Sequence, residues 1–307
     1  MTLLRWLESI RVPFLDSLFS LVTRLGEETL IVVAGLLFFW CISKKQGYYL
    51  LAVGFVGTVV NQFLKLAFRV PRPWVKDESF TIVESARAEA TGYSFPSGHT
   101  QNAVGIFGGI ARANKNTVLR VLCVTVAVLV SLSRMYLGVH TPADVGVAFV
   151  MAAVLVFALY PLVGRALESK KGMRIFFLVM TVLALVYVLY AALWPFPADA
   201  DAENLAHGVE NGYKILGCLV GLYLVYEIDE RWIRFNTKAV WWAQVLKLVL
   251  GLIPLLAIQA GLKQPLLSLF GGNAAAHAVR YFLMVLYAGG VWPLTFRFFG
   301  KLGRKNG

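Results

Sequence analysis

The sequence predicts an all-α polytopic membrane bundle with about nine spanning helices, preceded by an N-terminal interfacial helix. Of its 307 residues, 58% are hydrophobic and only 15% are charged, whereas a soluble domain carries about 25% charged residues. Several apolar runs approach the ~20 residues that cross about 30 Å of hydrocarbon. These runs are continuous and lack the period-two alternation of a membrane β-barrel, so they predict helices.

The first 25 residues predict the interfacial helix. They interleave Leu and Phe with charged residues, namely Arg5, Glu8, Arg11, Asp16 and Arg24. This amphipathic pattern is typical of a helix that lies in the plane of the membrane interface. A cleaved signal peptide would show an uninterrupted apolar core instead.

Nine apolar segments follow, and we interpret each as a spanning helix. Their approximate ranges are 29–42, 48–68, 96–111, 118–137, 142–163, 175–194, 213–226, 240–262 and 277–296. A polar stretch, 69–92, separates the second segment from the third. The three cysteines, Cys41, Cys123 and Cys218, lie inside apolar runs without metal or redox spacing.

The formal net charge of +12 is concentrated in alternate connections between the apolar segments. The basic connections hold Lys44 and Lys45; Arg112, Lys115 and Arg120; Arg165, Lys170, Lys171 and Arg174; Arg231, Arg234 and Lys238; and Lys301, Arg304 and Lys305. The positive-inside rule places these connections in the cytoplasm. The amino terminus, stretch 69–92 and the turn around His140 then lie on the external face of, we expect, the plasma (inner) membrane. We interpret the basic charge as orientation and anionic-lipid contact, and we expect no nucleic-acid partner because no groove-reading motif is present.

Three strings of polar residues fall where helices meet that external face. The first is KLAFRVPRP, residues 65–73. Lys65 and Arg72 are seven residues apart, which predicts that they share one helix face, and Pro71 and Pro73 end that helix. The pair is explained either as basic side chains that snorkel at a helix end or as cations that bind an anion.

The second string, FPSGHT, holds Pro96, Ser97, Gly98 and His99. Pro96 opens a helix, and the free backbone N–H groups of its first turn suit an anion. Gly98 allows an anion to approach the backbone closely. An ordinary Ser-capped helix start explains the same letters equally well.

The third string, SRMYLGVHTPAD, holds Ser133, Arg134, His140 and Asp144. Thr141 and Pro142 read as the N-cap and first residue of a helix. Asp144 either completes that cap or holds a ring N–H of His140, and both roles can coexist. His140 alone could equally be an interfacial histidine without a task.

Together the three strings supply the groups that phosphoryl transfer needs. Cations neutralise the equatorial oxygens, one imidazole attacks phosphorus, and a second imidazole protonates the leaving oxygen. Charges near hydrocarbon cost several kcal/mol unless they pair or serve a task. The combination therefore favours a phosphate site over three unrelated helix ends.

The three strings resemble the motifs of the type 2 phosphatidic acid phosphatase superfamily, the lipid phosphate phosphatases. That pattern is Lys, six residues, Arg-Pro; then Pro-Ser-Gly-His; then Ser-Arg, five residues, His, three residues, Asp. Here it reads Lys65 to Arg72-Pro73, Pro96 to His99, and Ser133-Arg134 to His140 to Asp144. The resemblance covers about residues 1–165, which predicts a membrane phosphatase core, 1–165, and a C-terminal transmembrane extension of unknown role, 166–307.

The resemblance implies metal-independent, vanadate-sensitive hydrolysis of a lipid phosphate or diphosphate without a cofactor. His140 would form a phosphohistidine, Asp144 would orient it, and His99 would protonate the leaving group and then activate water. The phosphate would be held by Lys65, Arg72, Ser97, Gly98 and Arg134. Two alternatives stay open: a phosphotransferase with an alcohol acceptor, and a non-catalytic lipid-binding or transport protein. The ionisable residues of the extension predict mainly paired or snorkelling roles; they include His207, Glu210, Lys214, Lys247, His277 and Arg280.

Overall fold

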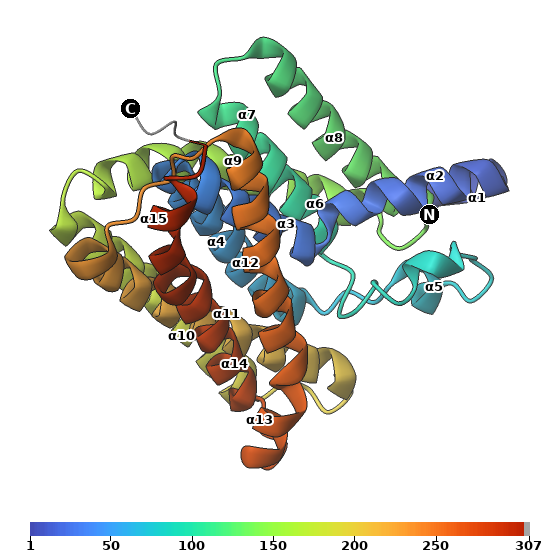
Figure 1. Ribbon diagram of the computed structural model, residues 1–307. Coiled ribbons are helices and arrows are strands. Elements are labelled where there is room, and N and C mark those ends of the chain that lie inside the picture. Colours follow the sequence, from blue (N-terminus) through green and yellow to red (C-terminus); the bar gives the residue numbers. More distant parts are fainter. Residues whose placement is uncertain (304–307) are drawn as a thin grey trace. The chain divides into compact units, whose positions relative to one another are not determined.

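The computed structural model describes residues 1–303 and is built from helices (Figure 1). Helix accounts for 79% of it, and residues 1–303 contain no strand. The helices are α1 (Thr2–Ser9), α2 (Pro13–Thr23), α3 (Glu28–Leu37), α4 (Lys44–Phe68), α5 (Pro73–Lys76), α6 (Gly98–Ala103), α7 (Gly109–Ala113), α8 (Thr117–Tyr136), α9 (Pro142–Ala166), α10 (Lys170–Leu193), α11 (Ala202–Ile228), α12 (Trp241–Gly261), α13 (Lys263–Leu269), α14 (Ala275–Leu286) and α15 (Phe296–Phe299). The predicted all-α membrane fold is confirmed.

The predicted count of nine spanning helices is not confirmed. Six helices of the described chain are long and apolar enough to span: Lys44–Lys76, Thr117–Tyr136, Pro142–Ala166, Lys170–Leu193, Trp241–Leu269 and Ala275–Phe299. A seventh is added if Pro13–Gly26 and Glu28–Ile42, which meet at a bend of 50°, form one broken span.

Three predicted spans account for the difference. Segment 29–42 is the second arm of the bent pair. Segment 96–111 belongs to a helix that runs only from Gly98 to Ala113, interrupted by a π-helical turn at Val104–Gly108, and is shorter than a usual membrane span. Segment 213–226 lies in α11, which is long but carries Glu203, Glu210 and Lys214 in its first half. All three segments are helical, so their secondary structure was predicted correctly, whereas their length as straight spans and their apolar character were predicted too high.

The N-terminal region forms two helices rather than one. α1 ends at Ser9, and Pro13 begins α2 at a position where a missing N–H costs no hydrogen bond. Their interfacial location stays a prediction. Of the predicted basic residues, Arg304 and Lys305 lie outside the described residues.

The chain forms two compact units. Unit 1 comprises Met1–Val32, Leu50–Pro161 and Ala191–Gly208; unit 2 comprises Val33–Tyr49, Leu162–Tyr190 and the chain from Val209 onward. Every residue predicted for the phosphate site lies in unit 1.

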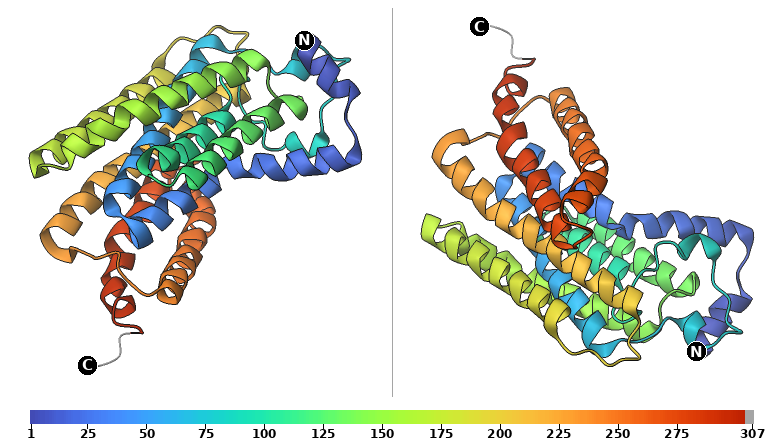
Figure 2. Two further views of the ribbon diagram at one scale, coloured as in Figure 1. Left: turned by 90° about the horizontal axis from the view of Figure 1, so that it is seen from above. Right: turned by 90° about the horizontal axis from the view of Figure 1, so that it is seen from below.

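Within unit 1, α8 is the helix on which the site is assembled. α1, α2 and α6 all pack against it (Figures 1 and 2). Gly26, just after α2, permits this packing: a Cβ there would approach Val130 of α8 to 2.8 Å and the His99 carbonyl oxygen to 2.9 Å. Any larger residue at position 26 would therefore push the end of α2 away from α6 and α8.

A small apolar core fixes the turn that follows α8. It consists of Leu4, Phe80, Ile82, Ala86, Tyr136, Leu137 and Val139. Gly138 adopts the left-handed region, with φ of 82°, and ends α8 as glycine commonly does. Because a Cβ at Gly138 would come within 2.6 Å of the Arg11 guanidinium, the turn before His140 depends on glycine twice.

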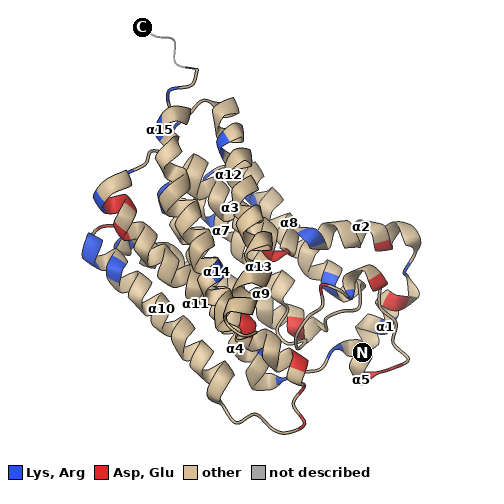
Figure 3. Ribbon diagram, turned by 60° about the horizontal axis from the view of Figure 1, so that its bottom comes forward, with Lys and Arg blue, Asp and Glu red and all other residues tan. Residues whose placement is uncertain are grey.

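Unit 2 carries basic residues at several helix ends, several of them paired with carboxylates (Figure 3). Arg174 of α10 binds Glu227 of α11 at 2.6 Å, and Lys170 lies 3.3 Å from Glu230. Lys44 pairs with the buried Asp229. These ends contain part of the basic set predicted to be cytoplasmic, and that orientation stays a prediction.

Candidate active site

The first motif does not lie on one helix face, contrary to the prediction. α4 ends at Phe68, Arg69 adopts a left-handed conformation with φ of 47°, and Arg72 is extended. Pro71 lacks the N–H that a continuing helix needs and disfavours the α region for Val70. The helix therefore stops earlier than expected, and a turn brings Arg72 back towards the site.

Lys65 and Arg72 are both buried, each 6% exposed, and both are held by backbone carbonyl groups. Lys65 Nζ donates to the Tyr93 carbonyl. Arg72 donates to the carbonyl oxygens of Thr91 (2.7 Å), Gly92 (3.1 Å) and Val139 (3.0 Å). Stretch 69–92 and the segment after it thus fix the positions of both cations without neutralising them.

The second motif starts a helix, as predicted. Ser97 is the N-cap of α6, and its hydroxyl accepts a hydrogen bond from the Thr100 N–H at 3.4 Å. The N–H groups of Gly98 and His99 lie in the first turn, where no intrahelical acceptor exists. No heavy atom lies within 4 Å of the position that a Cβ would take at Gly98, so space exists in front of this backbone.

His140 lies in the turn between α8 and α9 and is 2% exposed. Arg72 Nη1 donates to His140 Nε2 at 2.9 Å. Because a guanidinium can only donate, Nε2 is the unprotonated ring nitrogen and the ring proton lies on Nδ1. Nδ1 faces Asp144, whose Oδ2 is 3.5 Å away.

Asp144 performs the predicted capping role and also faces the histidine. Its Oδ2 accepts hydrogen bonds from the Thr141 N–H at 2.8 Å and from the Ser94 hydroxyl at 2.5 Å. Its carbonyl oxygen accepts from the Ser97 N–H at 3.0 Å. Asp144 therefore links the second and third motifs. It fills the capping role, whereas His140 Nδ1 makes no hydrogen bond within residues 1–303, so the role of Asp144 in orienting His140 stays a prediction.

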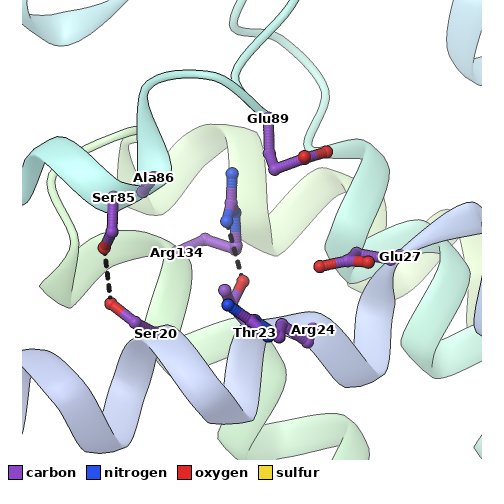
Figure 4. Close-up of a pocket in the computed structure, with 8 residues that line it drawn as sticks. All are labelled: Ser20, Thr23, Arg24, Glu27, Ser85, Ala86, Glu89 and Arg134. Atoms are coloured by element: carbon purple, nitrogen blue, oxygen red, sulfur yellow. Dashed lines mark hydrogen bonds between the residues drawn. The ribbon is translucent and has the colours of Figure 1, made fainter.

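Arg134, in the last turn of α8, is completely buried. Its Nη1 donates to the Thr23 hydroxyl at 2.7 Å, while Nε and Nη2 have no partner within residues 1–303. The guanidinium borders a cavity of about 310 Å³ that is lined from α2, from α8 and from the segment with Ser85, Ala86 and Glu89 (Figure 4). His99 Nε2 is likewise buried without a partner in the described chain.

The charges converge electrostatically on His140. Burial, followed by the charges of Arg72, Arg134 and Lys65 and the ring of His99, lowers the pKa of His140 well below its ordinary 6.5. The imidazole is therefore neutral at pH 7, with the Nε2 lone pair directed towards the cations. Around His140, three cations and the carboxylate of Asp144 make a site for a multiply charged anion, and two further carboxylates, Glu27 and Glu89, line the cavity beside Arg134.

Residues 1–303 contain no group of three or more His, Cys, Asp or Glu side chains that could hold a metal ion. The positive charge of the site comes from Lys65, Arg72 and Arg134.

Comparison with known proteins gives the family. The model of the PAP2 superfamily matches residues 45–168, and that of the PAP2 superfamily phosphatase transmembrane extension matches residues 213–305. The chain is 32% identical over 148 residues to undecaprenyl-diphosphatase BcrC of Bacillus subtilis (strain 168), covering 48% of this chain and 74% of that protein. It belongs to the PAP2 superfamily. The predicted superfamily and the enzyme class, a phosphoric ester hydrolase of lipids, are thereby confirmed.

Other PAP2 proteins show similar coverage. Phosphatidylglycerophosphatase B of Bacillus subtilis (strain 168) is 30% identical over 161 residues, covering 48% of this chain and 75% of that protein. The crystal structure of a transmembrane PAP2 type phosphatidylglycerolphosphate phosphatase from Bacillus subtilis is 27% identical, with a TM-score of 0.42, and covers 52% of this chain and 81% of that chain.

The sequence did not reveal several groups that complete this PAP2 site. Ser94 binds Asp144, Thr23 binds Arg134, and the Tyr93 carbonyl binds Lys65. Thr23 carries no sequence signal, because it is far from the motifs along the chain. Ser94 could have been suspected, since it lies three residues before Ser97 in the same polar segment.

Proposed function

We propose that this PAP2 protein hydrolyses a lipid phosphate or diphosphate without a metal, through a phosphohistidine on His140. The contact between Arg72 Nη1 and His140 Nε2 carries the proposal. This contact places the Nε2 lone pair of His140 beside Arg72, a cation that can bind phosphate. The charges of Lys65 and Arg134 act on the same ring, and neither side chain makes a direct ion pair within residues 1–303. A phosphoryl group at this point would have its oxygens on the cations and its phosphorus facing Nε2.

In the first step, His140 Nε2 attacks phosphorus and the bond from phosphorus to the leaving oxygen breaks. His99 must be protonated for this step: burial and the charges of Arg134, Arg72 and Lys65 lower its pKa in the free protein, and the negative charge of the bound phosphate opposes those charges. His99 then transfers its proton to the leaving oxygen, so an alcohol, or a phosphate from a diphosphate, departs neutral or protonated. The Nδ1 proton stays on His140, where Asp144 stabilises the positive charge of the ring. Lys65, Arg72, Arg134, Ser97 and the Gly98 backbone hold the phosphoryl oxygens.

In the second step, His99 takes a proton from water as the water oxygen attacks phosphorus. The P–N bond breaks, inorganic phosphate leaves, and His140 recovers its neutral form with the proton on Nδ1. Both steps balance without an outside reactant other than water. The products of this scheme are inorganic phosphate and the dephosphorylated lipid.

A lipid substrate follows from the membrane setting of the site. Lys65 and Arg134 lie near the ends of apolar helices long enough to span a bilayer. Two relatives, of which the chain covers 74% and 75%, are named for undecaprenyl diphosphate and phosphatidylglycerophosphate. The alternation of basic connections supports a plasma-membrane protein whose site faces the non-cytoplasmic side.

We also propose that residues 1–165 form the catalytic core and that 166–307 serve as an accessory extension. All eight proposed site residues fall before 165, and the matched PAP2 region ends at residue 168. The separate match at 213–305 supports a distinct extension.

The test is phosphate release from a panel of lipid phosphates and diphosphates in detergent, with EDTA present. His140→Ala should lower kcat by about 10⁴-fold or more, as loss of a nucleophile does in other enzymes. His207→Ala is the matched control, because this histidine is partly exposed and pairs only with Glu203 in the described chain. Undiminished turnover in His140→Ala, or complete loss with EDTA, would refute the mechanism.

A further inference from the structure

The cavity beside Arg134 has a mostly polar lining and suits a polar group. α2 and the residues that follow it supply Ser20, Thr23, Arg24 and Glu27. The 3₁₀ turn Glu84–Ala86 supplies Ser85 and Ala86, and Glu89 follows that turn (Figure 4). Nearly all of these side chains are polar, so a lipid tail would desolvate them without compensation. The volume of the cavity, about 310 Å³, suits a small head group or water.

The deep end of the cavity is electropositive. Arg134 is 0% exposed, and its Nε and Nη2 groups have no acceptor within residues 1–303. The Thr23 hydroxyl accepts a hydrogen bond only from Nη1 of Arg134. Buried donors without acceptors are costly, and phosphoryl oxygens are the acceptors that a guanidinium binds best.

The outer part of the cavity is different, because it carries two carboxylates. Glu27 is half-buried and Glu89 is exposed. Within the described chain, neither side chain makes a hydrogen bond or an ion pair, whereas Ser20 and Ser85 bond to each other at 2.7 Å. Arg24 also lines the cavity but is exposed to solvent.

Ionised carboxylates only accept hydrogen bonds. In this position they complement a group that donates, such as a hydroxyl or an ammonium, and they repel a second phosphate. A cation at the deep end and acceptors nearer the surface therefore distinguish between parts of one head group.

We propose that Glu27 and Glu89 determine substrate specificity by selecting lipid monophosphates that carry a hydroxyl or ammonium group beside the phosphate, over diphosphates. The inference rests on the proposed function, since it places the reacting phosphate on Arg134. It narrows the substrate class that the motif residues leave open.

The experiment measures kcat/KM for four substrates in wild type, Glu27→Gln, Glu89→Gln and the double variant. Phosphatidylglycerophosphate offers a hydroxyl and also carries a phosphodiester, sphingosine 1-phosphate offers an ammonium and a hydroxyl, phosphatidate offers neither donor, and farnesyl diphosphate offers a second phosphate attached to the first. Glu84→Gln is the matched control, because Glu84 lies on the same segment and pairs with Arg87 outside the cavity.

In the double variant we expect kcat/KM to fall about tenfold for the donor-bearing substrates and to rise at least about threefold for the diphosphate, as loss of charged hydrogen bonds and of like-charge repulsion predicts. Phosphatidate should change less than about twofold. A loss confined to sphingosine 1-phosphate would identify its ammonium as the donor, and a loss shared by both donor-bearing substrates would identify the hydroxyl.

Unchanged ratios among the four substrates in the double variant would overturn this proposal. If His140→Ala is inactive in the same assay, the proposed hydrolysis survives that outcome. Activity retained by His140→Ala would overturn the proposed function instead.

Discussion

The two units both bury basic side chains, but they treat the charge differently. In unit 2, Arg280 donates to the Gln259 carbonyl at 3.2 Å and to His277 at 3.1 Å. Glu210 lies 2.8 Å from Lys214 and 3.6 Å from His277, so a carboxylate accompanies this group of cations. The cluster holds two permanent cations, Lys214 and Arg280, against one carboxylate, and that carboxylate pairs directly with Lys214.

In unit 1, Lys65, Arg72 and Arg134 donate to hydrogen-bond acceptors but make no direct ion pair with a carboxylate within residues 1–303, although Glu27 and Glu89 line the cavity beside Arg134. The buried carboxylate of this unit, Asp144, is bonded to Ser94 and Thr141 instead. Isolated charge in a low-dielectric setting is costly, and it persists where a ligand neutralises it. The comparison therefore teaches that the absence of a direct ion pair, more than burial, distinguishes the active site from a structural ion cluster.

The strongest test of this contrast is Asp144→Asn. The amide keeps the volume but cannot stabilise the charged His140 ring, and it disturbs the tautomer that leaves Nε2 free. Loss of the equivalent carboxylate in other histidine-dependent enzymes costs about 10⁴ in kcat. We expect a fall of about 10³- to 10⁴-fold in phosphate release at pH 7.

The control for this prediction lies in unit 2. Asp229 is also buried and also bonded, to Lys44 and to the Phe235 N–H. Asp229→Asn should lower thermal stability while leaving kcat within about twofold. Equal losses of activity in the two variants would erase the distinction between the units.

A second prediction concerns pH and has a smaller effect. Burial, Arg72, Arg134 and Lys65 lower the pKa of His140, so the reactive neutral ring persists at pH values where an ordinary histidine is protonated. Arg72→Met removes the largest charge effect and raises the pKa of His140 towards 6.5. The acid limb of kcat/KM should therefore move to higher pH in the variant.

The measurement is a kcat/KM profile from about pH 5 to about pH 8 for wild type and variant with one substrate. The ionisation of the substrate phosphate is the same in both profiles, so the difference reports the enzyme. An acid limb that stays in place, or moves to lower pH, would mean that uncompensated cations do not tune His140.

Sequence reasoning anticipated the chemistry better than the local geometry. Residue types and spacing indicated that Arg72, His140 and Asp144 belong together, because several charges at apolar helix ends are costly unless they pair or bind a ligand. The prediction that Lys65 and Arg72 share one helix face was wrong, because helical periodicity does not show that Pro71 ends the helix before Arg72. The π-helical turn in the helix that follows Ser97 is likewise invisible to apolar patterning.

The partners that position the site were hidden for a different reason. Thr23 meets Arg134 through the packing of α2 on α8. Glu27 and Glu89 reach the same cavity from two other segments, one after α2 and one after the 3₁₀ turn Glu84–Ala86. Contacts between residues so distant along the chain leave no periodic signal. Spacing can therefore predict which groups react, whereas tertiary packing decides what surrounds them.

The smallest effect on activity is expected from Glu210→Gln in unit 2. The amide keeps its size but leaves Lys214, His277 and Arg280 without a counter-charge, so this cluster acquires the imbalance that unit 1 already has. Since Glu210 and Lys214 are 30% and 20% exposed, we expect the free energy of unfolding to fall by about 1–2 kcal/mol, less than the loss expected for a fully buried pair. This corresponds to a lower Tm by roughly 2–8 °C, measured by thermal unfolding in detergent, with kcat within about twofold of wild type. A tenfold loss of kcat at unchanged Tm would instead show that the ion cluster of the extension takes part in turnover, and that charge compensation does not separate a structural site from a catalytic one.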